Sequence, residues 1–309
     1  MDNITHSLIG AALGQAGLKR RTGLGMPALI IGANIPDVDA ACFFWLEGTE
    51  HLGFRRGITH GPIAWLVLPL LLAAGLWGYD RWQDRRGKRP EGRLPVQFGW
   101  LFLLGLIGTL SHPLFDWFNN YGIRLLEPFS SEWFYGDTLF IIDLWILLGL
   151  GLAVWLSRRR ERAGQGHWAR PAVTALAVLA GYSGVNTAIS LASVRAVRAD
   201  LPGLTLAMAN PMPAAFWQRE VLWRSADGHY GKVPCAFARC AAPAPPLGRT
   251  GMADPRIAEW ARGDPQAEAF LFWSRMPIAA PGPKGILLTD QRFMDVPTRG
   301  NFTVELKPR

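Results

Sequence analysis

The sequence has 309 residues, of which half are hydrophobic and only 18% are charged. Soluble domains carry about 25% charged residues, so this composition argues against an ordinary soluble protein. The net charge is +8, yet the Lys and Arg residues form short runs between apolar stretches, as they do in the cytoplasmic loops of membrane proteins. We therefore expect membrane lipid as a partner and no nucleic acid.

The apolar stretches predict a polytopic helix bundle, because a helix that crosses a bilayer needs roughly 20 apolar residues. Four stretches meet or approach this length, at residues 62–79, 98–118, 139–156 and 172–194. Two shorter ones, 4–18 and 26–35, precede them and are expected to form a helical hairpin held inside the bundle.

Three basic runs predict the orientation of these helices. They lie at residues 19–21, 81–93 and 158–170. If all three face the cytoplasm, the alternation of the helices is consistent at every loop. The segments expected outside are then residues 1–6, 36–61, 116–138 and everything after residue 194. The protein is thus predicted to be a multi-pass protein of the inner (plasma) membrane.

The C-terminal part differs in character from the rest of the chain. It contains many prolines, no spanning stretch, a helical pattern at 266–275 and short strand patterns at 220–224, 285–289 and 302–306. The fold class is therefore mainly α, with a membrane-embedded domain (1–198) followed by a small extracytoplasmic α+β domain (199–309). Whether Cys235 and Cys240 form a disulfide stays open.

Ionisable side chains gather where the predicted helices meet the outer surface. His6, His60, His112 and Asp116 come from four places in the sequence, and the orientation derived from the basic runs brings them to one side of the membrane. A single histidine in an apolar helix is more often a hydrogen-bonded structural residue than a ligand. Several ionisable groups together at membrane depth favour a function, because each is costly there without a partner.

The spacing of His112 and Asp116 is typical of two ligands of one metal ion. Residues four apart lie on one face of a helix, and Pro113 predicts that a helix begins here. Imidazole and carboxylate without thiolate suit zinc, with manganese or iron(II) as alternatives. A catalytic metal lowers the pKa of its bound water toward about 7, which favours hydrolysis.

Three further residues have candidate roles. Arg55 and Arg56 precede His60 and are expected either to hold an anionic group such as phosphate or to contact lipid headgroups. Arg56 would stabilise negative charge that develops in the reaction, and Asp37 would act as a general base or as the partner of a metal ligand.

Five motifs occur in the order found in the YdjM-type inner-membrane proteins, which the chain resembles from residue 1 to about 194. They are D-N-I-T-H-S-L-I-G, N-I-P-D-V-D, R-G-I-T-H-G, S-H-P-L-F-D-W-F-N-N-Y-G and the run P-F-S…D…F-I-I-D. The resemblance implies a membrane-bound metal-dependent hydrolase.

The order of these His and Asp residues is also similar to the zinc-dependent phospholipase C and single-strand nuclease superfamily. Carried over, this similarity implies one metal site made of Asp39 (or Asp37), His60, His112 and Asp116. A second site would share Asp116 and add His6. The ligands of a third zinc have no counterpart between residues 119 and 143, so one or two ions are expected, and phosphoester chemistry is implied.

We therefore predict a metal-dependent phosphoester hydrolase that acts on a lipid or a lipid-linked substrate. Two alternatives use the same His and Asp cluster: a transporter of metal ions or protons, and a membrane scaffold with a structural metal. The oligomeric state stays open.

Overall fold

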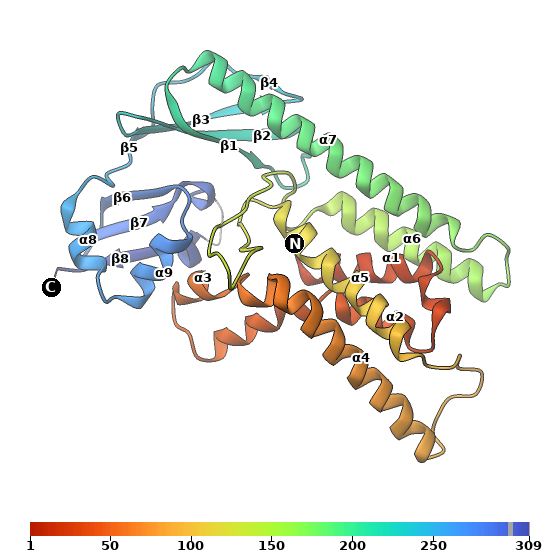
Figure 1. The fold of residues 1–309 in the computed structure, drawn as a ribbon. Helices are drawn as coiled ribbons and strands as arrows, with labels where there is room; N and C mark the ends of the chain where they lie inside the picture. Colours follow the sequence, from red (N-terminus) through yellow and green to blue (C-terminus); the bar gives the residue numbers. More distant parts are fainter. Residues whose placement is uncertain (296–298, 309) are drawn as a thin grey trace. The chain divides into compact units, whose positions relative to one another are not determined.

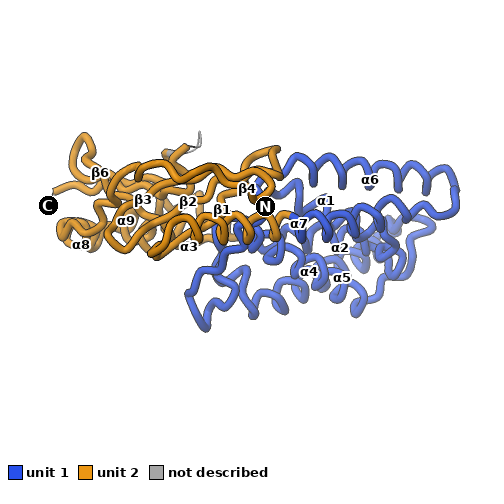
Figure 2. The backbone as a smooth tube through the Cα atoms, turned by 90° about the horizontal axis from the view of Figure 1, so that it is seen from above, with its two compact units in different colours: residues 1–38, 56–185 blue, residues 39–55, 186–309 orange. Residues whose placement is uncertain are grey.

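The computed structural model describes residues 1–295 and 299–308, and its chain forms two compact units (Figure 2). The N-terminal unit contains residues 1–38 and 56–185, and the C-terminal unit contains residues 39–55 and 186–309. The predicted fold class is confirmed in its main features, because the chain is mainly helical and has a β-sheet region at its C-terminal end.

The N-terminal unit is built from helices (Figure 1). They are α1 (Asn3–Gln15), α2 (Gly25–Gly32), α4 (Pro62–Arg85), α5 (Phe98–Trp117), α6 (Leu144–Arg162) and α7 (Arg170–Asp200), together with the 3₁₀ helices η1 (Leu18–Arg21), η2 (Ile35–Phe44) and η3 (Ile58–His60). Both η2 and α7 continue into the other unit. Helix α1 begins where Asp2 accepts hydrogen bonds from the backbone N–H groups of Ile4 and Thr5. Asp143 caps the start of α6 in the same way.

Three helices of the described chain are long and apolar enough to cross a membrane, namely α4, α5 and α7. A fourth candidate is the pair α2 and η2, which is bent by 51°. The stretch 139–156, also predicted to span, is not among these candidates, because only its residues from Leu144 onward are helical, in α6, which begins after the Asp143 cap. Arginines then occupy its last turns.

Helices α1, α2 and α5 approach one another at glycines. A Cβ on Gly10 would lie 2.7 Å from the carbonyl oxygen of Leu29, and one on Gly108 would lie 2.6 Å from the same atom. A Cβ on Gly32 would lie 2.7 Å from the carbonyl oxygen of Gly105. Small residues at such crossings let helix backbones pack closely in membranes. The closeness of α2 to α5 therefore depends on these positions having no side chain.

The C-terminal unit contains two antiparallel sheets. One consists of β1 (Leu204–Pro211), β2 (Gln218–Ser225), β3 (His229–Ala236) and β4 (Arg239–Cys240), with β5 (Gly248–Arg249) on β3; the other of β6 (Pro277–Pro281), β7 (Ile286–Asp290) and β8 (Thr303–Leu306). Two helices, α8 (Pro255–Ala261) and α9 (Pro265–Trp273), lie between the sheets in the sequence. The strands predicted at 220–224, 285–289 and 302–306 and the helix predicted at 266–275 are confirmed.

A segment from the first part of the sequence completes this unit. Helix α3 (Glu50–Phe54) packs on α9, where Gly53 lies against Ala269 and the hydroxyl of Thr49 donates to the carbonyl oxygen of Gln266 at 2.8 Å. Residues 39–55 therefore group with the C-terminal residues. A disulfide joins Cys235 to Cys240 across the paired strands β3 and β4.

We predict that Gly108→Ala destabilises the protein by about 1–3 kcal/mol, because the added methyl group would force α5 away from the backbone of α2. Thermal unfolding of the purified protein in detergent measures this effect. Gly99→Ala, in the same helix, is the matched control, since a Cβ there meets nothing within 4 Å. Equal melting temperatures for the two variants would contradict the close helix contact.

Candidate metal centre

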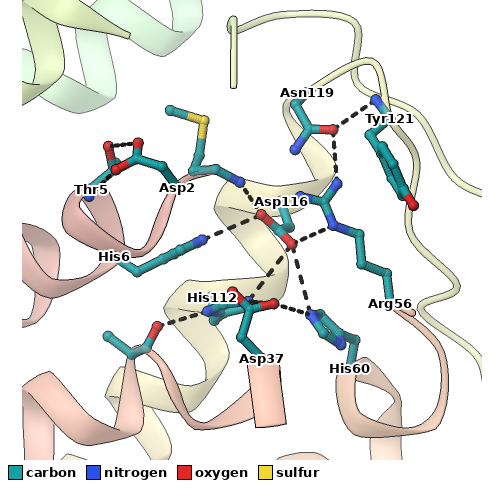
Figure 3. A network of polar contacts seen from close by, with 12 residues as sticks. Asp2, Thr5, His6, Asp37, Arg56, His60, His112, Asp116, Asn119 and Tyr121 are labelled. Carbon is teal, nitrogen blue, oxygen red and sulfur yellow. Dashed lines mark hydrogen bonds and ion pairs between the residues drawn. The ribbon is translucent and has the colours of Figure 1, made fainter. Parts of the chain in front are cut away.

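Four side chains from three segments of the N-terminal unit converge on one point (Figure 3). Asp37 comes from η2, His60 from η3, and both His112 and Asp116 from α5. One donor atom from each lies within 4.8 Å of all the others, so the four residues could hold a metal ion. The side chains of His60 and His112 are 0% exposed, that of Asp116 is 1% exposed, and that of Asp37 is 8% exposed.

The distances within this group suit donors that share an ion. The Nε2 atom of His112 lies 3.7 Å from Asp37 Oδ1 and 3.7 Å from Asp116 Oδ2. The Nε2 atom of His60 lies 4.0 Å and 3.7 Å from the same two oxygens. These separations exceed a hydrogen bond. Donors about 2.0–2.1 Å from a tetrahedral zinc ion lie roughly 3.4 Å apart, so a small inward movement would bring all four donors within coordination distance of one ion.

Hydrogen bonds on the outer side of the imidazoles fix how they point. The Nδ1 atom of His112 donates to the carbonyl oxygen of Ala33 at 2.7 Å. Because a carbonyl only accepts, Nδ1 carries the proton and Nε2 turns its lone pair toward the group. His60 makes the corresponding bond between its Nδ1 atom and the hydroxyl of Thr59, at 2.9 Å. Such outer bonds are typical of histidines that bind metals.

His60 is suited to metal binding by its charge state as well. Burial lowers the pKa of its imidazole well below the usual value, despite the nearby carboxylates of Asp116 and Asp37. The ring is therefore neutral at physiological pH, and neutral imidazole is the form that coordinates metals.

Arg56 is bound to the group itself. Its Nε atom lies 2.9 Å from Asp116 Oδ2, and its Nη1 atom donates to the side chain of Asn119 at 3.1 Å and to the carbonyl oxygen of Gly122 at 3.3 Å. The guanidinium also lies over the ring of Tyr121, 4.6 Å from its centre. These contacts hold Asp116 in place, and they occupy the guanidinium that we predicted for an anionic substrate group.

His6 borders the group but does not belong to the four. Its ring stacks on that of His112 with centroids 3.8 Å apart, and its Nε2 atom lies 3.3 Å from Asp116 Oδ1. The amino group of Met1 contacts the same oxygen. His6 thus contacts Oδ1 of Asp116, whereas His60 faces Oδ2 of the same carboxylate.

Of the five predicted ligands, the structure brings three into the group, His60, His112 and Asp116, and joins them with Asp37. Asp39 instead pairs with Arg55, whose Nε atom lies 3.5 Å from its Oδ1. Both carboxylates lie in η2, where successive residues turn by about 120°, so two residues two apart face different sides. The motif N-I-P-D-V-D does not say which of its carboxylates faces inward.

The position of the His112 and Asp116 pair within its helix differs from the prediction. Pro113 lies inside α5, and the pair occupies the C-terminal end of the helix and not its start. Sequence reasoning also missed the outer partners Thr59 and Asn119. Their positions in the sequence were the only signal: Thr59 directly precedes His60, and Asn119 lies three residues after Asp116.

These observations define a class of protein: a membrane protein whose helices carry a buried cluster of His and Asp side chains able to hold a metal ion. The chain belongs to the family of YdjM inner membrane proteins, whose family model matches residues 1–192. The resemblance inferred from the five motifs is therefore confirmed.

One curated relative is similar over part of the chain. The uncharacterized protein YfhP of Bacillus subtilis (strain 168) is 27% identical over 165 residues, which cover 50% of this chain and 46% of that protein. The chain thus spans about half the length of this relative. No solved structure matches the chain.

We predict that Asp37→Asn lowers metal affinity by at least about 100-fold, since it removes a ligand and not an outer partner. Asp39→Asn is the matched control two residues away, and it should leave metal binding unchanged. Elemental analysis of the two purified variants after equilibration with limiting zinc, manganese or iron(II) measures the difference. Loss of metal from Asp39→Asn alone would refute the ligand assignment.

Proposed function

We propose that this protein is a membrane-bound metal-dependent hydrolase that cleaves a phosphoester in a lipid or a lipid-linked substrate. The observation that carries the proposal is the buried group of Asp37, His60, His112 and Asp116, with its hydrogen-bonded outer partners. A divalent ion held there would lower the pKa of a water molecule and polarise a phosphoryl oxygen. Four protein donors leave a position for water when the ion takes five or six ligands.

The residues of the chain have separate roles in this proposal. The two imidazoles and the two carboxylates hold the ion, and their two negative charges balance a divalent cation. Arg56 positions Asp116 through its 2.9 Å contact and limits how far that carboxylate can turn. Asp37 is the most exposed of the four, so substrate would approach from its side.

A hollow of about 490 Å³ borders the group on that side. Its polar lining residues are Asn3, Asn34 and Asp37, and the rest of the lining is apolar: Ile30, Ile31, Ile35 and Val38. Ile31 and Val38 are exposed. An apolar wall that ends at a charged residue suits a molecule with a hydrocarbon chain and a polar head. This arrangement supports a lipid substrate over a small soluble ester.

We predict that His112→Ala and Asp116→Asn each lower phosphoester hydrolysis by about a thousandfold or more, since a catalytic metal supplies several kcal/mol of transition-state stabilisation. Turnover of aryl phosphoesters and of lipid phosphates by the purified protein in detergent measures the effect. His167→Ala is the control, because this exposed residue lies far along the sequence from the group.

Full turnover and metal content in His112→Ala would rule out the proposed centre. Metal flux into liposomes by wild-type protein, without hydrolysis of any phosphoester, would favour the transporter alternative. An ion with no exchangeable water in spectroscopy would favour the scaffold.

We also propose that the chain crosses the membrane several times, with the metal centre near the outer surface and the C-terminal unit outside. The basic runs at 19–21, 81–93 and 158–170 support this orientation. The disulfide between Cys235 and Cys240 supports it independently, because disulfides persist mainly in oxidising compartments.

We predict that a membrane-impermeant maleimide applied to right-side-out vesicles labels Pro202→Cys and leaves Gln165→Cys unlabelled. Both positions are exposed; Gln165 precedes the first residue of α7 and Pro202 follows its last, so they lie beyond opposite ends of this helix. Permeabilised vesicles, in which both variants should react, are the control. Cys42 is buried and adds little background. Labelling of Gln165→Cys alone in sealed vesicles would reverse the proposed orientation.

A further inference from the structure

A second apolar groove, separate from the metal centre, runs between helices α6 and α7. It has a volume of about 640 Å³, and its walls include Gly149, Leu152, Leu156 and Val178. Leu152 is 58% exposed and Val178 is 63% exposed, which would be unfavourable in water. In a membrane protein, such a groove at the helix surface is filled by hydrocarbon.

Two arginines stand at one end of this groove. Arg160 lies in the last turn of α6, and Arg170 is the first residue of α7, so both are next to the loop that joins the helices. The nearby carboxylate of Glu161 pairs with Lys19 and Arg20 instead. Within the described part of the chain, neither groove arginine has a carboxylate within ion-pair distance.

The groove also has the length of a lipid chain. Trp145 and Arg160 both line it and are 15 residues apart on α6, which corresponds to roughly 22 Å of helix. One leaflet of a bilayer has a hydrocarbon thickness of about 15 Å. An acyl chain that starts at the arginines would therefore lie within the groove along its whole length.

We infer that the groove between α6 and α7 is a binding site for one anionic phospholipid. Its phosphate contacts Arg160 and Arg170, and an acyl chain lies between the two helices toward Trp145. The charge of the two arginines selects an anionic headgroup, and the leucine and valine walls accept any acyl chain. The site is independent of the proposed hydrolysis, because none of its lining residues belongs to the metal centre.

Titration of the delipidated, detergent-purified full chain with phosphatidylglycerol and with phosphatidylcholine of the same acyl chains tests the inference by native mass spectrometry. Wild-type protein should bind the anionic lipid about tenfold or more tightly than the zwitterionic one. The double variant Arg160→Ala/Arg170→Ala should lose this preference. Its matched control is Arg159→Ala/Arg162→Ala, which removes two arginines of the same helix end that do not line the groove.

A second pair of variants tests the place of the acyl chain. Gly149→Phe puts a ring into the groove, and a Cβ at this position meets nothing within 4 Å, so folding should be unaffected. It should weaken binding of both lipids about equally. Gly151→Phe is the control, since this glycine is equally open but lies outside the groove.

Three results would overturn the inference. They are equal affinity of the wild-type protein for the two lipids, an unchanged preference in Arg160→Ala/Arg170→Ala, and a change of oligomeric state on gel filtration in Gly149→Phe without loss of lipid. The last would identify a second copy of the chain as the occupant of the groove.

Discussion

The N-terminal unit depends on keeping two carboxylates and two imidazoles away from water among apolar helices. Burial of such groups costs several kcal/mol unless each has a partner. Partners exist on their outer sides, where the Ala33 carbonyl holds His112 and the Arg56 guanidinium holds Asp116. On their inner sides the donors face one another at 3.7–4.0 Å, too far apart for hydrogen bonds. A divalent cation would satisfy all four donors at once.

The same constraint explains the close packing of α2 against α5. The carbonyl of Ala33 is left without a helical partner where α2 ends, so it is available to the Nδ1 atom of His112. It reaches that atom only because Gly32 and Gly108 bring the two backbones together. Gly32 and Gly108 do not line the metal centre, yet they determine the direction in which His112 points. The packing of the helices and the geometry of the centre therefore depend on the same contacts.

Much of this arrangement could be predicted because it follows from local patterns. Apolar stretches predicted the long helices, and a spacing of four placed His112 and Asp116 on one face of α5. What could not be predicted depends on contacts between segments distant in the sequence. Only the placement of η2 decides that Asp37, and not Asp39, faces the group. Likewise, the sequence does not distinguish an arginine that binds an anionic substrate from one that already binds a carboxylate of the protein. The partner of Arg56 therefore became evident only from the fold.

The uneven exposure of the four donors bears on whether the centre is structural or catalytic. A structural ion is closed off on every side by its protein ligands, whereas a catalytic one keeps an approach for water and substrate. Here His60, His112 and Asp116 are at most 1% exposed, while Asp37 is 8% exposed and borders an apolar hollow. An ion held by these residues would be reached from one side only, past isoleucine side chains that suit a hydrocarbon chain. A centre needed only for stability would gain nothing from such an approach, so this asymmetry supports the proposed function, in which an enzyme takes its substrate from the membrane, over the scaffold alternative.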